Sequence, residues 1–340
     1  MRTRCLLIFF CAVLATASVA QEQRFADLGD FKLESGETLR DCRIGYRTVG
    51  VMNADKSNMI VMPTWAGGTT EQLASDVGPD KLADSSKYYV ILIDALSNGV
   101  SSSPSNSKQQ PHMHFPRITI ADMVSTEHDL LTRVLHINHV RAVMGISMGG
   151  MQTFQWMVQY PDFMDKAIPI VGSPRLAPYD LLDWSTQLGA IMNDPTWQHG
   201  DHTREPERVA EYEFGALMLT SPEHVNRSMT REEVMQKIAE AARSNDGQDA
   251  NNKIRQTQAM MALDVSQRFN GSVERAAATV KAQVLVVVSR QDHVVTPQPA
   301  IDFARLLKVE PLILDSDCGH LAPGCEAQRM DTAVAQFLAR

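Results

Sequence analysis

The stretch Gly145-Ile146-Ser147-Met148-Gly149-Gly150 decides the fold of this chain. The apolar run 140–144 precedes it, and the segment 151–158, which has helical character, follows it. A strand, then Gly-x-Ser-x-Gly, then a helix is typical of a nucleophile elbow, which lifts a serine hydroxyl above a sheet edge. Side chains at positions 145 and 149 would collide with neighbouring backbone, so glycine is required there. Ser147 is therefore the candidate nucleophile, and the alternative is a serine in a glycine-rich turn that only begins a helix.

A nucleophilic serine needs a histidine base, and the base needs an acid that orients it. The sequence holds ten histidines, and His320 is favoured because it follows the last strand-like run. Asp292 follows the preceding strand-like run, which gives the chain order serine, acid, histidine expected after such an elbow. Asp315 and Asp317 are rivals in sequence, but they share a loop with His320 and would reach its ring poorly.

Acyl transfer also requires donors for the oxyanion of the tetrahedral intermediate. The backbone N–H of Met148, directly after the serine, is the first candidate. The loop Pro63-Thr64-Trp65-Ala66-Gly67-Gly68 follows an early strand-like run and suits the second. Trp65 is the preferred donor and Thr64 the next, and the alternative is that the two glycines form only a flexible connector.

Short apolar runs rich in valine and isoleucine predict strands of a buried parallel sheet. They are 44–49, 59–62, 89–93, 142–146, 167–171, 284–288 and 312–314. Helical patterns lie between them, at 119–135, 151–159, 297–307 and 327–339. This alternation predicts an α/β fold, with a mostly parallel sheet and helices on both faces.

The pattern changes after residue 174, where strand-like runs stop for about 110 residues. Helical stretches replace them at 179–192, 206–219, 231–243, 253–269 and 272–280. An insertion of this kind between two strands is interpreted as a helical lid over the carboxyl edge of the sheet, where substrates bind. The predicted organisation is a signal peptide at 1–20, the core at 21–174, the lid at 175–281 and the rest of the core at 282–340.

The amino terminus is typical of a secretory signal. Arg2 and Arg4 precede an apolar stretch that is short for a membrane span, and Ser18-Val19-Ala20 supplies small residues for cleavage. We expect cleavage after Ala20 and an exported protein, periplasmic or secreted, with no stable membrane insertion; the alternative is a retained anchor. In an oxidising compartment Cys318 and Cys325, which bracket His320, are candidates for a disulfide, and the alternative is unpaired thiols.

Composition and motifs also limit which partners and cofactors are expected. The net charge of −8 argues against nucleic acid and anionic membrane surfaces. His112 with His114, and His199 with His202, lack a cysteine or carboxylate at ligand spacing, so we expect loop histidines and no metal. The sequence has no glycine-rich nucleotide motif after a strand, so we expect no cofactor.

Several stretches together resemble the homoserine O-acetyltransferase family of α/β hydrolases. They are GYRTVG (45–50), VGP (77–79), FPRITIADMV (115–124), GISMGGMQ (145–152) and AIMNDP (190–195). The resemblance covers the chain from Ile44 to its carboxyl terminus. It implies a Ser147–Asp292–His320 triad that takes an acyl group from an ester or thioester and passes it to a hydroxyl or water. It also allows a lid-mediated homodimer.

The chain departs from that family at the contacts that would hold homoserine. The family uses an arginine and a tyrosine in the lid, where this chain has Phe214 and Ser221, and an aspartate after the catalytic histidine, where it has Leu321. Thr64 and Trp65 replace residues of the family's oxyanion loop. The predicted residues of the substrate pocket are Thr64, Phe214, Ser221 and Leu321. Because arginine pairs with a carboxylate and aspartate with an ammonium, a pocket without them should not favour a zwitterion.

The sequence therefore favours an exported ester hydrolase, acting on a less charged small-molecule acyl ester. Export points the same way, because acetyl-CoA is a cytoplasmic metabolite. One alternative is an acyl-CoA-dependent O-acetyltransferase that acts on homoserine or another hydroxyl acceptor. Another alternative, from a different class, is a non-catalytic binding protein on a hydrolase scaffold.

Overall fold

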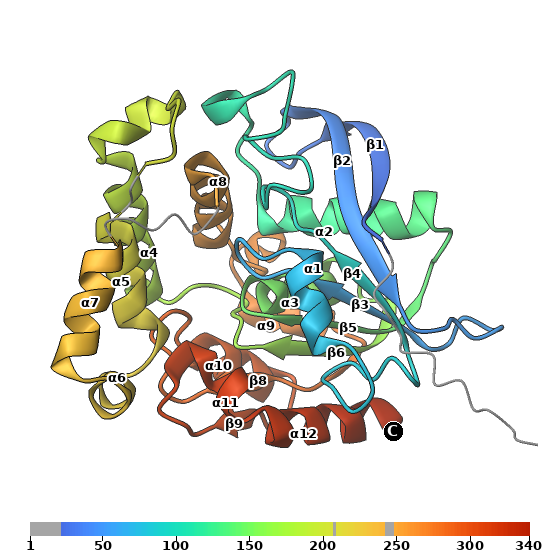
Figure 1. The fold of residues 1–340 in the computed structure, drawn as a ribbon. Helices are drawn as coiled ribbons and strands as arrows, with labels where there is room; N and C mark the ends of the chain where they lie inside the picture. The colour runs from blue at the N-terminus through green and yellow to red at the C-terminus, as the bar shows by residue number, and fades with distance from the viewer. Residues whose placement is uncertain (1–21, 207–208, 242–247) are drawn as a thin grey trace, which may run out of the picture.

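A nine-stranded sheet forms the centre of this computed structural model, which describes residues 22–206, 209–241 and 248–340 (Figure 1). The strand order is β1-β2-β4-β3-β5-β6-β8-β9, with β7 beside β6. The strands are β1 (Arg24–Lys32), β2 (Thr38–Val49), β3 (Met59–Pro63), β4 (Tyr89–Ile93), β5 (Val140–Ile146), β6 (Met164–Ile170), β7 (Gln283–Val284), β8 (Val287–Ser289) and β9 (Leu312–Leu314). The pairs β1–β2 and β2–β4 are antiparallel, and the others are parallel, which confirms the predicted α/β class.

Strand β2 begins at Thr38 rather than at the predicted residue 44, and two further strand features differ from the prediction. Strand β1 was not predicted, because its buried residues Ala26, Leu28 and Phe31 alternate with polar ones and a bulge at Gly29 interrupts the alternation. The run 284–288, predicted as one strand, forms β7 and β8, which both pair with β6. The buried parallel strands are therefore recognisable as continuous apolar runs, whereas the half-exposed edge strand β1 is not.

Alternate residues of the central strands enter two apolar cores, one on each face of the sheet. Val61 and Ile91 belong to the core beneath α2, α3, α9 and α10, whereas Ile60 and Leu92 belong to the core beneath α12. These helices are α2 (Ile120–Asp129), α3 (Met148–Gln159), α9 (Val273–Ala278), α10 (Gln298–Leu306) and α12 (Ala327–Ala339). The shorter α1 (Thr70–Leu73) and α11 (Ala322–Cys325) lie next to loops of the site. Helices thus cover both faces, as predicted.

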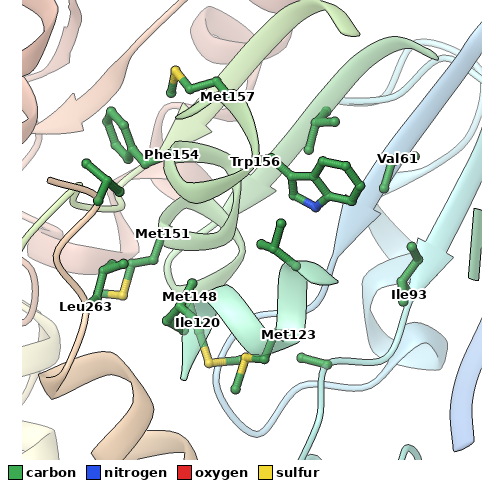
Figure 2. Packing of buried hydrophobic residues seen from close by; sticks show 14 of the residues in the cluster. Val61, Ile93, Ile120, Met123, Met148, Met151, Phe154, Trp156, Met157 and Leu263 are labelled. Atoms are coloured by element: carbon green, nitrogen blue, oxygen red, sulfur yellow. The ribbon is translucent and has the colours of Figure 1, made fainter. Parts of the chain in front are cut away.

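Helix α3 is buried from Met148 to Val158. Figure 2 shows Met148, Met151, Phe154 and Met157 packed among side chains of neighbouring elements, with Trp156 on the side toward Val61. The predicted helix 151–159 therefore begins three residues earlier, directly after Ser147. Because its first turn is fixed on every side, the helix gives the serine a rigid support.

Among the described residues, five of the helices between β6 and β7 make up the insertion that the sequence predicts to be a lid, and this insertion is called the lid below. They are α4 (Pro178–Met192), α5 (Val209–Leu219), α6 (Pro222–Ser228), α7 (Arg231–Ala241) and α8 (Ala250–Met261). Figure 1 shows α4, α5 and α7 beside one another, with α8 nearer to the sheet. Helix α6 was not predicted, and the predicted helix 253–269 begins at Ala250 and ends at Met261. Helix α9, inside the range predicted for the lid, packs against α10 in the core.

The predicted signal peptide, 1–20, lies outside the described residues, and so does its cleavage position. Within the described ranges, none of the helices has the length and apolar character that a membrane crossing needs.

A buried carboxyl group joins α2 to α3. Glu127 is 1% exposed, and its Oε2 accepts a hydrogen bond of 2.6 Å from Trp156 Nε1. Within the described residues its Oε1 has no partner. Burial raises the pKa of Glu127 to about 8, although the Trp156 hydrogen bond acts in the opposite direction. Between the ordinary pKa of a glutamate and about 8, Glu127 therefore keeps its proton in the folded protein and loses it in the unfolded chain.

We predict that Glu127 makes the protein less stable as pH rises from about 5 to about 8, by up to about 1.4 kcal/mol per pH unit. Glu127→Gln, a neutral isostere, should be close to wild type near pH 5 and more stable than wild type near pH 8.5. Urea unfolding of both proteins across this pH range measures the difference between their free energies of unfolding. Other titrating groups contribute equally to both proteins and therefore do not affect this difference. A difference that does not change with pH would contradict the assignment.

Candidate active site

Ser147 lies in a strained turn between β5 and α3. Its backbone angles, φ 56° and ψ −120°, fall where non-glycine residues are rarely found. Such a conformation costs on the order of 1–3 kcal/mol and persists only where surrounding structure enforces it. The Ser147 N–H donates to the Ile170 carbonyl at 2.9 Å, which fixes the turn to the neighbouring strand β6.

Close backbone packing enforces this turn. A Cβ at Gly145 would lie 2.3 Å from the Gly149 carbonyl oxygen, and a Cβ at Gly149 would lie 2.6 Å from the Pro63 carbonyl oxygen. Neither position can hold a side chain without moving backbone. The glycines of the sequence motif therefore permit the contact between the elbow, its own helix and the loop after β3.

Three side chains from separate loops form a hydrogen-bonded relay. His320 Nε2 lies 2.9 Å from Ser147 Oγ, and His320 Nδ1 lies 2.7 Å from Asp292 Oδ2. The Asp292 carboxylate only accepts, so the neutral ring carries its proton on Nδ1 and Nε2 accepts from the serine hydroxyl. His320 and Asp292 are 9% and 3% exposed. The structure thus brings together the three residues selected from the sequence, whereas Asp315 and Asp317 bond to other groups.

The Asp292 loop is fixed by its own backbone and by the lid. Asp292 Oδ1 accepts from the N–H groups of Val294 and Val295, both at 2.9 Å. Helix α4 holds the same loop, because Asp180 Oδ1 accepts from the Thr296 N–H and Trp184 Nε1 donates to the Val294 carbonyl. These contacts aim the second carboxylate oxygen at the imidazole.

The His320 loop carries a disulfide and bonds to a second lid helix. Cys318 and Cys325 are joined, with their Cα atoms 6.5 Å apart. The Asp317 carboxylate accepts from Arg227 Nη2 at 2.8 Å and lies 3.2 Å from His224 Nδ1, and both partners belong to α6. Some loss of hydration acts to raise the pKa of Asp317, but these two hydrogen bonds prevail and lower it.

Two backbone N–H groups are candidate donors for an oxyanion site beside Ser147. Met148 begins α3, so its N–H has no acceptor within the helix. The Thr64 N–H donates to the Ile93 carbonyl at 3.1 Å, so this backbone donor is already engaged. Among the described residues nothing accepts from the Trp65 N–H. The geometry therefore favours Trp65 over Thr64 as the second donor.

A cavity of about 1040 Å³ opens on Ser147 and His320. Its apolar wall includes Trp65, Ile146, Trp184, Leu219, Met260, Val294 and Leu321. Its polar wall includes Asp76, Lys81, Gln187, Glu211, Lys253 and Gln256. The site therefore combines an apolar surface near the reacting groups with charged and amide groups, most of them from the lid.

The predicted pocket residues need correction. Of the four, only Leu321 lines the cavity, and it is 48% exposed. Ser221 is buried, and its hydroxyl accepts from the His224 N–H at the start of α6. Phe214 lies outside the lining, which α5 supplies instead through Gly215 and neighbouring residues. Thr64 is buried beneath the loop.

Sequence reasoning missed the polar residues of the lid wall. Glu211 on α5 forms an ion pair with Lys253 on α8, and both line the cavity. Gln256, one turn further along α8, also lines it. In sequence these residues read as ordinary polar positions of amphipathic helices, and only the lid's placement brings them to the site.

The histidines considered as metal ligands belong to other arrangements. His202 Nε2 lies 3.1 Å from Glu205 Oε1 and 3.9 Å from Asp249 Oδ2, so two carboxylates approach it that local spacing did not reveal. Both acids also cap α8, where Glu205 accepts from the Ala250 N–H and Asp249 from the Asn252 N–H. Helix capping and the hydrogen bond between His202 and Glu205 therefore explain the cluster.

A family profile described as the alpha/beta hydrolase fold matches residues 58–324. The chain belongs to the α/β hydrolase family. This α/β hydrolase is 31% identical to an ethyl acetate hydrolase of Pseudomonas veronii, in a match that spans 92% of this chain and 93% of the relative. It is 28% identical to a homoserine O-acetyltransferase of Geotalea daltonii, over 95% of this chain and 98% of that one.

Solved structures agree with both sets of relatives. The acetyl esterase MekB superposes with a TM-score of 0.87 at 29% identity, over 94% of this chain and 97% of that one. Homoserine O-acetyltransferase from Bacillus anthracis has the same fold, with a TM-score of 0.84 over 95% of this chain and 98% of that one, at 22% identity. The protein is thus an enzyme of the homoserine O-acetyltransferase-like α/β hydrolases, with serine hydrolase or acyltransferase activity.

We predict that the Cys318–Cys325 disulfide supports this α/β hydrolase both in stability and in rate. Reduction, or the double substitution Cys318→Ser with Cys325→Ser, should lower the free energy of unfolding by about 2–3 kcal/mol. It should lower kcat for ester cleavage by about tenfold, since a roughly 1 Å shift of a catalytic group can cost a hundredfold. Activity and urea unfolding with and without dithiothreitol measure both effects. The double variant is the control and should not respond to dithiothreitol; unchanged wild-type activity on verified reduction would refute the prediction.

Proposed function

We propose that this protein is an exported carboxylic ester hydrolase that works through an acyl-Ser147 intermediate. The observation that carries the proposal is the Ser147–His320–Asp292 relay at the cavity, with hydrogen bonds of 2.9 and 2.7 Å. A serine hydroxyl is a weak nucleophile until an adjacent base takes its proton, and the relay meets that need.

In the first half-reaction, Ser147 Oγ attacks the ester carbonyl carbon while its proton passes to His320 Nε2. The carbonyl oxygen becomes an oxyanion, which the N–H groups of Met148 and Trp65 stabilise. The bond from the carbonyl carbon to the alcohol oxygen then breaks, and the alcohol leaves with the proton from His320. Asp292 stays ionised and stabilises the imidazolium that forms in between.

In the second half-reaction, water attacks the acyl-Ser147 carbonyl carbon. His320 Nε2 takes a proton from the water and returns it to Ser147 Oγ as the acyl–oxygen bond breaks. The products are a carboxylic acid and free enzyme. The same steps with an alcohol in place of water describe acyl transfer, so the occupant of the cavity at this stage decides between the two reactions.

The cavity wall supports an uncharged ester close to Ser147. Leu321, Leu219 and Val294 line the cavity with apolar surface, and Leu321 stands where the homoserine-type pattern has an aspartate. The similarity to an ethyl acetate hydrolase and to an acetyl esterase supports a short acyl group. A panel of p-nitrophenyl esters of increasing chain length tests this substrate class.

We expect the wild type to hydrolyse p-nitrophenyl acetate faster than the long-chain members of the panel. Ser147→Ala should lower kcat by at least about 10⁴-fold with its fold intact, because nucleophile and base act as one unit. Circular dichroism and thermal unfolding serve as the control for folding. No turnover of any ester by folded wild type would refute the hydrolase.

A second candidate function is O-acetyl transfer, which the 28% identity with a homoserine O-acetyltransferase over 95% of this chain favours. Release of CoA thiol from acetyl-CoA upon addition of homoserine would establish it in place of hydrolysis. The non-catalytic alternative has less support, since the hydrogen-bonded relay is complete.

Export is the remaining part of the proposal. The composition of residues 1–20 supports it, and so does the Cys318–Cys325 bond, because disulfides persist in oxidising compartments. We expect the full chain, expressed in a Gram-negative host, to be recovered from the periplasm or medium with Gln21 as its first residue. A cytoplasmic protein that keeps residues 1–20 would contradict export and leave the proposed chemistry untouched.

A further inference from the structure

The loop that carries Trp65 is held at two ends by different parts of the molecule. At Thr64 the core holds it, since the N–H donates to the Ile93 carbonyl and the carbonyl accepts from Gln152 Nε2 at 3.0 Å. At Gly67 the lid holds it, because the Gly67 N–H donates to Gln256 Oε1 at 2.7 Å. The Trp65 N–H lies between these two attachments, so both determine its direction.

Gln256 is suited to this contact by its position on α8 and its burial. It is 1% exposed, and its amide nitrogen donates to the Leu96 carbonyl at 3.0 Å. The side chain therefore bridges the loop after β4 and the loop after β3. The amide oxygen must accept and the amide nitrogen must donate, so only a carboxamide side chain satisfies both hydrogen bonds. Both polar atoms of the side chain are thereby used in the bridge.

The Gly67 backbone shows how closely α8 and the loop fit. Gly67 has φ +68°, and a Cβ there would lie 2.3 Å from the Gln248 side chain just before α8. Gly68 in turn has no room for a Cβ, which would lie 2.4 Å from the Trp65 indole nitrogen. The loop thus adopts a left-handed turn that brings its N–H to Gln256 and presses the Trp65 ring against its own backbone.

We propose that Gln256 is a positioning residue for catalysis: from the lid it holds the 64–68 loop so that the Trp65 N–H faces the oxyanion. The inference rests on the proposed acyl-transfer function and adds to it. The oxyanion site is then completed by helix α8, whereas its Met148 donor belongs to the core alone. Removing the Gln256 contact should weaken binding of the tetrahedral intermediate more than binding of the ester.

The test compares Gln256→Leu with Gln258→Leu, the same substitution on the same helix. Gln258 accepts from Arg255 Nη1 at 2.8 Å, and within the described residues no hydrogen bond joins its side chain to the 64–68 loop. With p-nitrophenyl acetate, Gln256→Leu should lower kcat by about 10- to 100-fold and change KM little, because a displaced oxyanion donor acts on the transition state. Gln258→Leu should keep kcat close to that of wild type.

A second readout separates positioning from general loosening of the lid. Phenylboronic acid bonds to a serine oxygen and forms a tetrahedral anion, so its inhibition constant should rise by about the same factor as kcat falls in Gln256→Leu. Gln256→Glu keeps an acceptor for the Gly67 N–H and loses the donor to Leu96, so it should recover part of the rate. If Gln256→Leu does not fold, Gln256→Glu replaces it and should have a kcat below that of Gln258→Leu.

The outcomes are distinct. Equal kcat and equal boronate affinity in Gln256→Leu and Gln258→Leu, in an active wild-type background, overturn this inference alone. A folded wild type that cleaves no ester overturns the proposed function and this inference with it. A fall in kcat that tracks the loss of boronate affinity, with KM nearly constant, supports the inference.

Discussion

The backbone of Ser147 is the constraint on which the rest of this structure depends. A non-glycine residue at φ 56° and ψ −120° is held there by glycines that let strand, helix and loop approach within van der Waals contact. Helix α3, buried along most of its length, prevents the turn from relaxing. This packing fixes the positions of the serine hydroxyl, the Met148 N–H and the loop after β3 relative to one another, as preorganised catalysis requires.

The lid does more than cover the cavity, because three of its helices form hydrogen bonds with three loops of the site. Helix α4 holds the Asp292 loop through Asp180, α6 holds the His320 loop through its contacts with Asp317, and α8 holds the Trp65 loop through Gln256. The loops that carry Asp292, His320 and Trp65 therefore depend on the same insertion that lines the cavity. Changes in the lid should alter rate as well as substrate preference.

The sequence selects the three residues of the hydrogen-bonded relay because their order along the chain follows from the fold. Ser147, Asp292 and His320 follow the parallel strands β5, β8 and β9, and parallel strands bring their carboxyl ends to one edge. The buried strands themselves are visible as apolar runs, whereas the exposed edge strand β1 is not.

The residues of the pocket are harder to predict from the sequence, because they lie on helices whose positions depend on tertiary packing. The family resemblance places Phe214 and Ser221 in the pocket, yet Ser221 caps a helix and α5 lines the cavity through Gly215 and its neighbours. Gln256 and the Glu211–Lys253 pair carry no local sequence signal at all. Their role depends on where α5 and α8 lie over the sheet, which the sequence pattern does not specify.

The central claim is that Ser147 forms the covalent intermediate, and rapid-quench mass spectrometry tests it most directly. Wild type mixed with excess p-nitrophenyl acetate, quenched in acid within the first turnovers and digested, should carry a single acetyl group on the peptide that contains Ser147. An active enzyme that carries no acetyl group, or carries it on another residue, would contradict the account.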